Sequence, residues 1–137
     1  MIETNITAAF QEKVIVAVAG SDYPTMPIAF IDLDFDPPED GKYLELVHIP
    51  NNPGDRTWGA EEVNRGIFRM ILHWPSNGSG ASAPRALMDS IASSFVKSEK
   101  IGGLLQVLNK PKAGSPAKLG NENLYPFTVE YIVFTVD

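Results

Sequence analysis

The sequence predicts an α+β fold: a mainly antiparallel sheet of five to six strands with two helices packed on one face. Three observations lead to this prediction. Two segments carry apolar residues at helical spacing, several others alternate apolar and polar residues, and the strand-like segments follow one another with short turns between them. Strands in such runs pair antiparallel, and two amphipathic helices need one apolar sheet face. The expected order is α-β-β-β-α-β-β, in a single domain spanning residues 1–137.

The first helix is expected over residues 2–19, ending at Gly20. Its apolar residues recur every three or four positions, while charged and polar residues fall on other faces. The recurring apolar residues are Ile2, Ile6, Ala9, Phe10, Val14 and Ala17.

Three strands are expected next, over residues 28–36, 43–50 and 66–74. The third is the most regular, because large apolar residues occupy every second position and are expected to face the core. These core residues are Phe68, Met70, Leu72 and Trp74. Between the second and third strands, residues 51–64 are expected to form a long polar loop.

The second helix is expected over residues 83–98, capped by Ser82 and carrying Pro84 in its first turn. Its apolar stripe consists of Leu87, Met88, Ile91, Ala92 and Phe95. A short strand over residues 104–108 and a long final strand over residues 125–136 are expected to follow. The segment between them, Lys110 to Gly120, is rich in Pro, Gly and Lys and is expected to be a loop that orders only against a partner.

The composition excludes several classes of protein. Of the 137 residues, 44% are apolar and 20% are charged, which is typical of a folded globular protein. There is no cysteine, so disulfides, thiolate zinc sites and cysteine nucleophiles are excluded. No apolar run approaches the length of a membrane span, and the N-terminus, with Glu3 and Glu12, does not resemble a signal peptide. The net charge of −6 argues against a dedicated nucleic-acid reader.

The aspartates at positions 32, 34, 36 and 40 resemble the start of a calcium-binding EF-hand loop. The resemblance fails at its diagnostic positions, because Pro37 stands where glycine is needed and Tyr43 where a bidentate glutamate is needed. Asp32, Asp34 and Asp36 are therefore interpreted as a solvated strand edge that blocks unwanted pairing. A weak divalent-cation site between subunits is the alternative. No structural metal is expected.

No catalytic set is evident. His48 and His73 are the only histidines, they lie on different expected strands, and no third ligand or nucleophile motif accompanies them. They are interpreted as partly exposed strand residues. The segment Ser76 to Gly80 precedes a helix but lacks the ending of a phosphate-binding loop. The chain is therefore expected to have no enzymatic activity, no cofactor and no catalytic residue.

Candidate protein-interface residues lie in and next to the loop at 51–64. Arg56, Trp58 and Arg65 are of the types that contribute most to interface energetics. The alternative for Trp58 is that it folds back onto its own core.

Part of the chain resembles the bacteriophage tail terminator-like proteins. The run Glu62 to Pro75 is similar to their central strand, and so is the following pattern of a loop with Gly78 and Gly80 and a helix carrying Met88 to Ala92 and Phe95. The first helix and the closing strand from Pro126 to Tyr131 fit the same order. No single functional residue of the family is fixed well enough to be transferred.

The resemblance implies a virion structural protein, without enzymatic activity, that is assembled in the host cytoplasm. Members of the family form a hexameric ring that caps the tail tube, stops its polymerisation and docks to the head. The implied partners are further copies of the chain, the tail tube protein and a head–tail connector or completion protein, with DNA passing through the lumen without specific binding. Another phage neck or tail protein is the first alternative. A small ligand-binding α+β domain using His48, His73 and the aspartates is the second.

Overall fold

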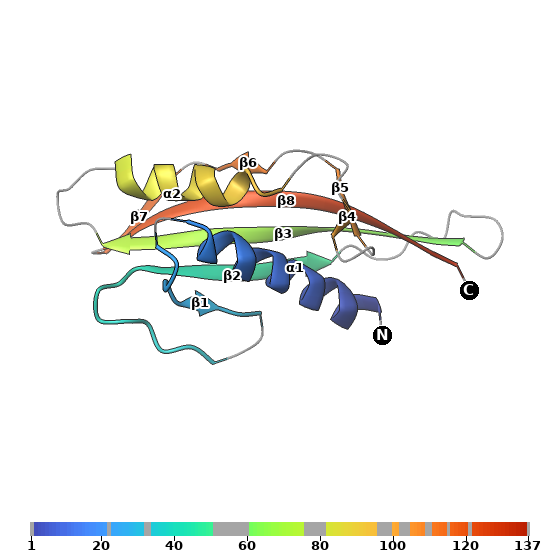
Figure 1. Ribbon diagram of the computed structural model, residues 1–137, viewed down its shortest axis with the longest axis horizontal. Helices are drawn as coiled ribbons and strands as arrows, with labels where there is room; N and C mark the ends of the chain where they lie inside the picture. The colour runs from blue at the N-terminus through green and yellow to red at the C-terminus, as the bar shows by residue number, and fades with distance from the viewer. Residues whose placement is uncertain are drawn as a thin grey trace.

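The computed structural model describes residues 2–21, 23–31, 34–50, 61–75, 82–95, 100–101, 105–108, 111–114, 116–120 and 122–136. These residues form two helices and eight strands of very different lengths (Figure 1). The helices are α1 (Ile2–Ala19) and α2 (Ser82–Ala92). The strands are β1 (Ile28–Ala29), β2 (Tyr43–Pro50), β3 (Glu61–Pro75), β4 (Lys100–Ile101), β5 (Leu105–Val107), β6 (Lys112–Ala113), β7 (Ala117–Leu119) and β8 (Glu122–Val136).

All eight strands belong to one sheet, in the order β1-β2-β3-β8-β5-β4, with β6 and β7 also paired to β8. Its centre is the antiparallel pair of β3 and β8, which are in register from Glu61 opposite Val136 to Pro75 opposite Glu122. The one parallel pair is β1 with β2. The predicted α+β class with a mainly antiparallel sheet is therefore confirmed, although the described sheet has more strands than expected.

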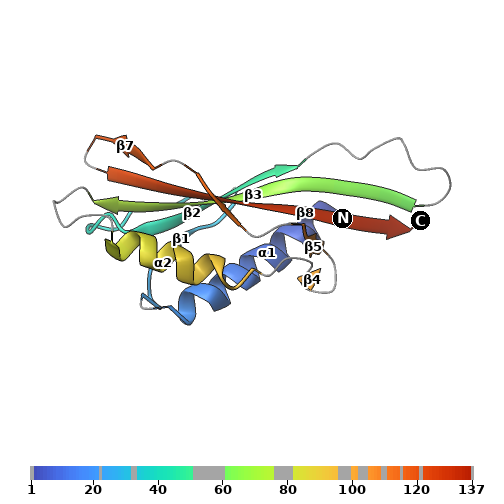
Figure 2. The same ribbon diagram turned by 90° about the horizontal axis from the view of Figure 1, so that it is seen from above.

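Both helices lie on the same side of the sheet (Figure 2). The predicted core strand faces them: Phe68, Met70 and Leu72 have no exposed surface, and Trp74 is 3% exposed. Phe10 of α1 stacks on Phe68 with ring centroids 3.9 Å apart and planes 4° apart. The alternation of apolar and polar residues therefore predicted correctly which side chains of β3 face the core. Both helices cover this one apolar face of the sheet.

The second helix is shorter than predicted. It ends at Ala92, and the chain turns through Ser93 to Phe95. Ser93 donates its hydroxyl to the carbonyl of Ser90 over 2.7 Å, a local bond that competes with continuation of the helix. Phe95 is still buried as expected, at 2% exposed, but it reaches the core from the turn. Residues 96–99 lie outside the described part.

The predicted strand over residues 28–36 is wrong beyond Ala29. The backbone N–H of Ile31 donates to the side chain of Gln11 in α1 over 3.0 Å, so a helix side chain replaces the strand partner. Further on, the ring of Phe35 lies against Tyr43. Ile31 lies outside the sheet, and residues 34–40 lie on the far side of β1 from β2 before the chain continues into β2 (Figure 1).

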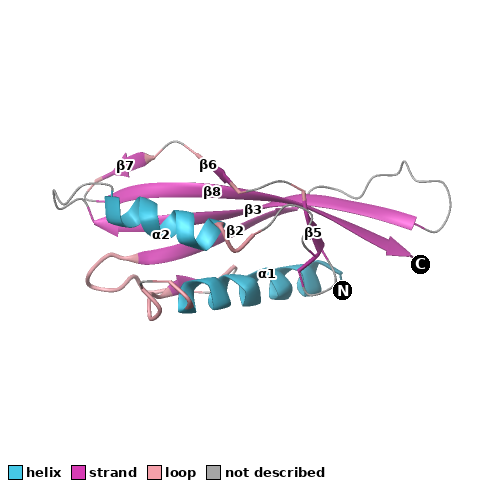
Figure 3. Ribbon diagram, turned by 45° about the horizontal axis from the view of Figure 1, so that its top comes forward, coloured by secondary structure: helices cyan, strands magenta, loops and turns pink. Residues whose placement is uncertain are grey.

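The last two differences concern the segments predicted to be loops. Residues 61–64 belong to β3, so that strand is longer than the predicted 66–74. The segment at 110–120 contains β6 and β7, and both pair with β8. The expectation that it orders only against a partner is wrong, because the free edge of β8 gives its polar backbone groups partners within the chain. Beyond β2 and β5, the β3–β8 pair continues as a two-stranded arm (Figure 3).

Candidate assembly surfaces

The predicted interface residues are only partly located by the structure. Arg56 and Trp58 lie outside the described residues. Arg65 lies in β3, opposite Ile132 of β8, where the central pair begins to extend past β2. The structure therefore places the backbone of Arg65 in the sheet.

The sheet face opposite the helices is covered by no helix of the described chain (Figure 2). Side chains there come from the strand positions that alternate with the core, among them Ile67 and Ile71 of β3, both partly exposed. Ile49 of β2 lies opposite Ile67 and is 42% exposed. This uncovered face thus presents aliphatic side chains to the outside, which is typical of a surface that contacts other proteins.

His73 lies on this face between two carboxylates. Its Nε2 is 2.8 Å from Oε1 of Glu45 on β2, and its Nδ1 is 3.2 Å from Oε1 of Glu122 on β8. Each ring nitrogen therefore faces a carboxylate oxygen, one from β2 and one from β8, so the His73 side chain bridges three strands. The prediction that His73 is partly exposed is wrong, since it is 7% exposed.

Tyr43 covers the ring of His73. The two rings stack with centroids 4.1 Å apart and planes 9° apart, and the two residues are direct partners across β2 and β3. Burial raises the pKa of the Tyr43 phenol, and the negative charges of Glu122 and Glu45 raise it further. The phenol therefore loses its proton only at a higher pH than an unperturbed tyrosine does. The cluster joins β2, β3 and β8 and has no evident catalytic geometry.

His48 lies on the other face of the sheet. It pairs with Phe68 across β2 and β3 and stacks on that ring at 4.4 Å. Its Nε2 is 2.7 Å from the hydroxyl of Tyr131. Because His48 points toward the helices and His73 away from them, the two histidines cannot form a joint base or ligand set.

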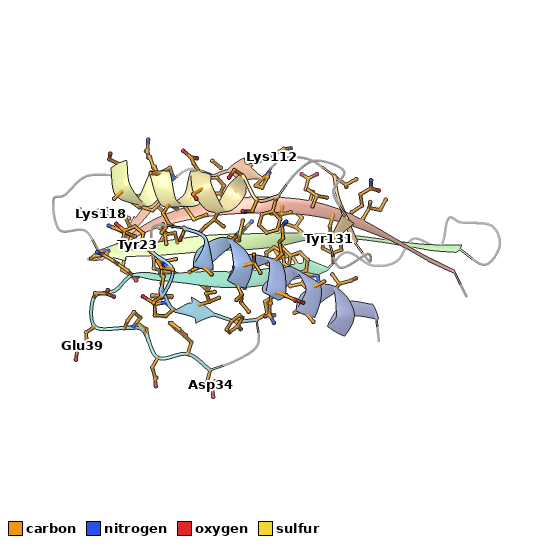
Figure 4. All side chains as sticks on the ribbon, viewed as in Figure 1. Tyr23, Asp34, Glu39, Lys112, Lys118 and Tyr131 are labelled. Carbon is orange, nitrogen blue, oxygen red and sulfur yellow. The ribbon has the colours of Figure 1, made fainter. Side chains whose placement is uncertain are left out.

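The aspartates do not form the predicted strand edge. Asp34, Asp36 and Asp40 are exposed on the segment that runs beside β1, and Asp32 lies outside the described residues. Asp34 and Glu39 point away from the body of the molecule (Figure 4). Within the described residues, no three His, Asp or Glu side chains are grouped so that they could hold a metal ion. The segment Ser76 to Gly80 also lies outside the described part.

Two lysines that the sequence placed in a loop lie on edge strands. Lys112 is in β6 and Lys118 in β7, and both are exposed on the β8 side of the sheet (Figure 4). Lys112 Nζ is 3.5 Å from Oε1 of Glu130, and its side chain is 67% exposed. Nothing in the polar sequence of this segment indicated strands, so these positions become visible only through pairing with β8.

A cavity of about 270 Å³ opens between α2, the segment from Ala113 to Pro116, and β8. Arg85, Met88 and Asp89 of α2 line it together with Tyr125 and Phe127 of β8. It is slightly smaller than the pockets that usually hold small-molecule ligands.

None of the helices in the described residues is long and apolar enough to cross a membrane. Several solved structures resemble this chain, and two of them match it over nearly its whole length. One protein structure is 23% identical with a TM-score of 0.76, covering 97% of this chain and 96% of its own. A chain of the virion of a native gene transfer agent particle is 12% identical with a TM-score of 0.57, covering 98% of both chains. At these identities the likeness establishes the fold.

No curated protein matches the chain. The model of a family described as phage tail terminator protein matches residues 5–131, which include most of α1, all of α2 and nearly all of the sheet. This match confirms the resemblance seen in the central strand and the second helix. The chain therefore belongs to the phage tail terminator family, which consists of structural proteins of the phage tail.

Proposed function

We propose that this protein is a tail terminator that forms a ring on the end of the tail tube, stops tube polymerisation and provides the surface to which the head docks. The observation that carries the proposal is the family match over residues 5–131. The uncovered sheet face with Ile49, Ile67 and Ile71 supports it, because a subunit that assembles needs surface that its own helices leave free.

Ring formation follows from the proposed role in stopping polymerisation of the tail tube. A head-to-tail contact between identical subunits either closes into a ring or continues as a filament, and a protein that ends polymerisation has to close. Six copies are proposed for the ring. The net charge of −6 suits a ring through which DNA passes, because an acidic lumen would repel the phosphate backbone and prevent specific binding.

The proposed partners are further copies of this chain, the tail tube protein and a head–tail connector or completion protein. The proposed location is the tail or neck of the virion, after assembly in the host cytoplasm. We also propose no enzymatic role, since His48 and His73 lie on opposite faces of the sheet. Arg56, Trp58 and Arg65 remain proposed contact residues, because Arg and Trp contribute disproportionately to interface energy.

Deletion of the gene in the parent phage tests the proposal. Electron microscopy of the lysate is expected to show tails longer than those of the wild-type phage, without attached heads. A plasmid copy of the gene is expected to restore tails of normal length with heads attached. Complementation by a copy carrying Arg56→Ala and Trp58→Ala is expected to be weaker.

The alternative is another neck or tail protein, such as a head completion protein. It makes a different prediction: the deletion would leave tails of normal length that fail to join heads, or heads that lose their DNA. Tails of normal length joined to heads would refute both roles.

A further inference from the structure

Two opposite edges of the sheet carry opposite charges. Beyond β1, the segment at 34–40 exposes four carboxylates: Asp34, Asp36, Glu39 and Asp40. Beyond β8, the edge strands β6 and β7 expose Lys112 and Lys118. In Figure 4, Glu39 and Lys118 lie toward the same end of the sheet, and Asp34 and Lys112 lie further along it. Acidic and basic side chains therefore follow the two edges in the same order.

The acidic segment is held in a fixed position. The ring of Phe35 packs on Tyr43 with centroids 4.9 Å apart. The N–H of Gly41 donates to the carbonyl of Pro38 over 3.0 Å, and the N–H of Lys42 donates to Oδ1 of Asp40 over 3.0 Å. Pro37 and Pro38 lack an N–H, so the segment is unsuited to pairing as a further strand. It presents carboxylates rather than backbone groups to a neighbour.

The two edges do not neutralise each other within one molecule. In the order β1-β2-β3-β8, followed by β6 or β7, they are separated by four strand spacings, about 19 Å. This exceeds the Debye length of about 8 Å at physiological ionic strength. Among the described residues, Asp34, Asp36 and Glu39 have no ion pair with any basic side chain. Lys112 has only the solvent-exposed contact with Glu130, which contributes little.

We propose that these edges meet between neighbouring copies of this chain, the segment at 34–40 of one copy lying against β6 and β7 of the next. The proposal rests on the ring proposed above and names the edges that join its subunits. A second copy is the occupant that the charges favour, because each molecule carries both complementary edges, on opposite sides. Such a contact is head-to-tail, which is the kind that closes a ring. The edge lysines would also reject partners that lack acidic residues at this position.

Cysteine cross-linking tests the contact, and the natural chain has no cysteine that would interfere. Protein with Glu39→Cys is mixed with protein carrying Lys118→Cys at high concentration under mild oxidation. The mixed 39–118 dimer is expected to exceed both symmetric dimers, and the double variant E39C/K118C is expected to give a ladder of multimers. The control pair Glu12→Cys and Asp89→Cys, on the exposed sides of α1 and α2, is expected to give no preferred mixed product.

Charge reversal tests whether the opposite charges of the two edges cause the copies to associate. K112E/K118E has two acidic edges and D34K/E39K has two basic edges, so each alone is expected to associate on the order of tenfold more weakly than wild type. An equimolar mixture is expected to recover association as alternating copies, measured by sedimentation velocity and weakened by added salt. The matched change E12K/D89K alters the net charge as much as D34K/E39K does and is expected to have no such effect. Glu130 lies beside Lys112, so K112E would also create repulsion between two carboxylates within one molecule. The variant K112Q/K118Q removes the positive charges without creating this repulsion.

Symmetric 39–39 and 118–118 products alone, or charge reversals that leave association unchanged, would overturn the contact. A chain that stays monomeric at every concentration without the mixed product would overturn it too. Binding of the basic edge only to tail tube protein would likewise assign that edge to a different partner. These results are independent of tail length in the gene deletion: overlong tails without the 39–118 product would leave the terminator role standing and remove only this contact.

Discussion

The phenol ring of Tyr131 lies directly over Gly66, its partner across the β3–β8 pair, and fills the space that a side chain at Gly66 would occupy. A Cβ atom at Gly66 would come within 2.7 Å of Cζ of Tyr131 and even nearer to its hydroxyl oxygen. That hydroxyl is hydrogen-bonded to Nε2 of His48 over 2.7 Å, and Tyr131 is only 2% exposed. Gly66 therefore leaves room above β3 for the buried ring of Tyr131 and its hydrogen bond to His48.

Gly66→Ala is expected to destabilise the protein by about 1–3 kcal/mol, because the ring must shift in a packed core and its bond to His48 is strained or lost. Urea unfolding followed by circular dichroism measures the change. Gly20→Ala is the control, since its Cβ would meet nothing closer than 3.6 Å, at the carbonyl of Val16. Equal stability of the G66A variant and wild type would show that Tyr131 can leave this position at no cost.

Phe10→Ala is expected to cost about 3–5 kcal/mol, because it removes a ring with no exposed surface that stacks on Phe68. The expected loss is a large part of the stability of a small protein, so the variant should unfold at much lower denaturant concentration. Ile15→Ala on the same helix is the matched control, as Ile15 is 46% exposed. The control is expected to change stability by no more than about 0.5 kcal/mol.

The bridge at His73 is expected to be energetically coupled to Glu45. A double-mutant cycle with His73→Gln, Glu45→Gln and the double variant is expected to give a coupling free energy of about 1 kcal/mol, since the two side chains are 2.8 Å apart. The Glu45 side chain is 41% exposed, so the value should fall with added salt. The same cycle with Glu12, which is exposed on α1, should give a coupling near zero. Additive effects at 45 and 73 would contradict the bridge.

Tyr43 is expected to ionise at higher pH than an unperturbed tyrosine, because its pKa is raised from 10.0 by burial and then by Glu122 and Glu45. A pKa that is higher in the folded than in the unfolded state contributes stability that is fully present below pH 10.0 and is lost as the pH rises through the folded value. Ultraviolet titration of wild type against Tyr43→Phe isolates this group from the other tyrosines. Glu45→Gln with Glu122→Gln should lower the Tyr43 pKa without returning it fully to 10.0, as burial remains.

Much of the fold could be predicted from the sequence, because the signals are local and periodic. Alternation placed Phe68, Met70, Leu72 and Trp74 in the core, and β2 has the predicted bounds of 43–50. Helical spacing gave α1 over residues 2–19. These patterns indicate which face of a helix or strand is apolar, and burial of that face orients the element toward the core.

Strand pairing and the contacts between distant segments could not be predicted from local sequence patterns. The polar residues of β6 and β7 become strands because β8 offers an edge, and residues 30–31 leave the sheet where Gln11 of α1 takes the backbone bond. His73 is buried because Glu45 and Glu122 come from two other strands to meet it. The opposite charges at the two sheet edges likewise come from segments far apart in sequence. The fold class and the core residues could be predicted from the amino-acid sequence, because both depend on the periodicity of apolar residues. Strand partners and the complementary charges on the surface depend on distances that exist only in the folded chain.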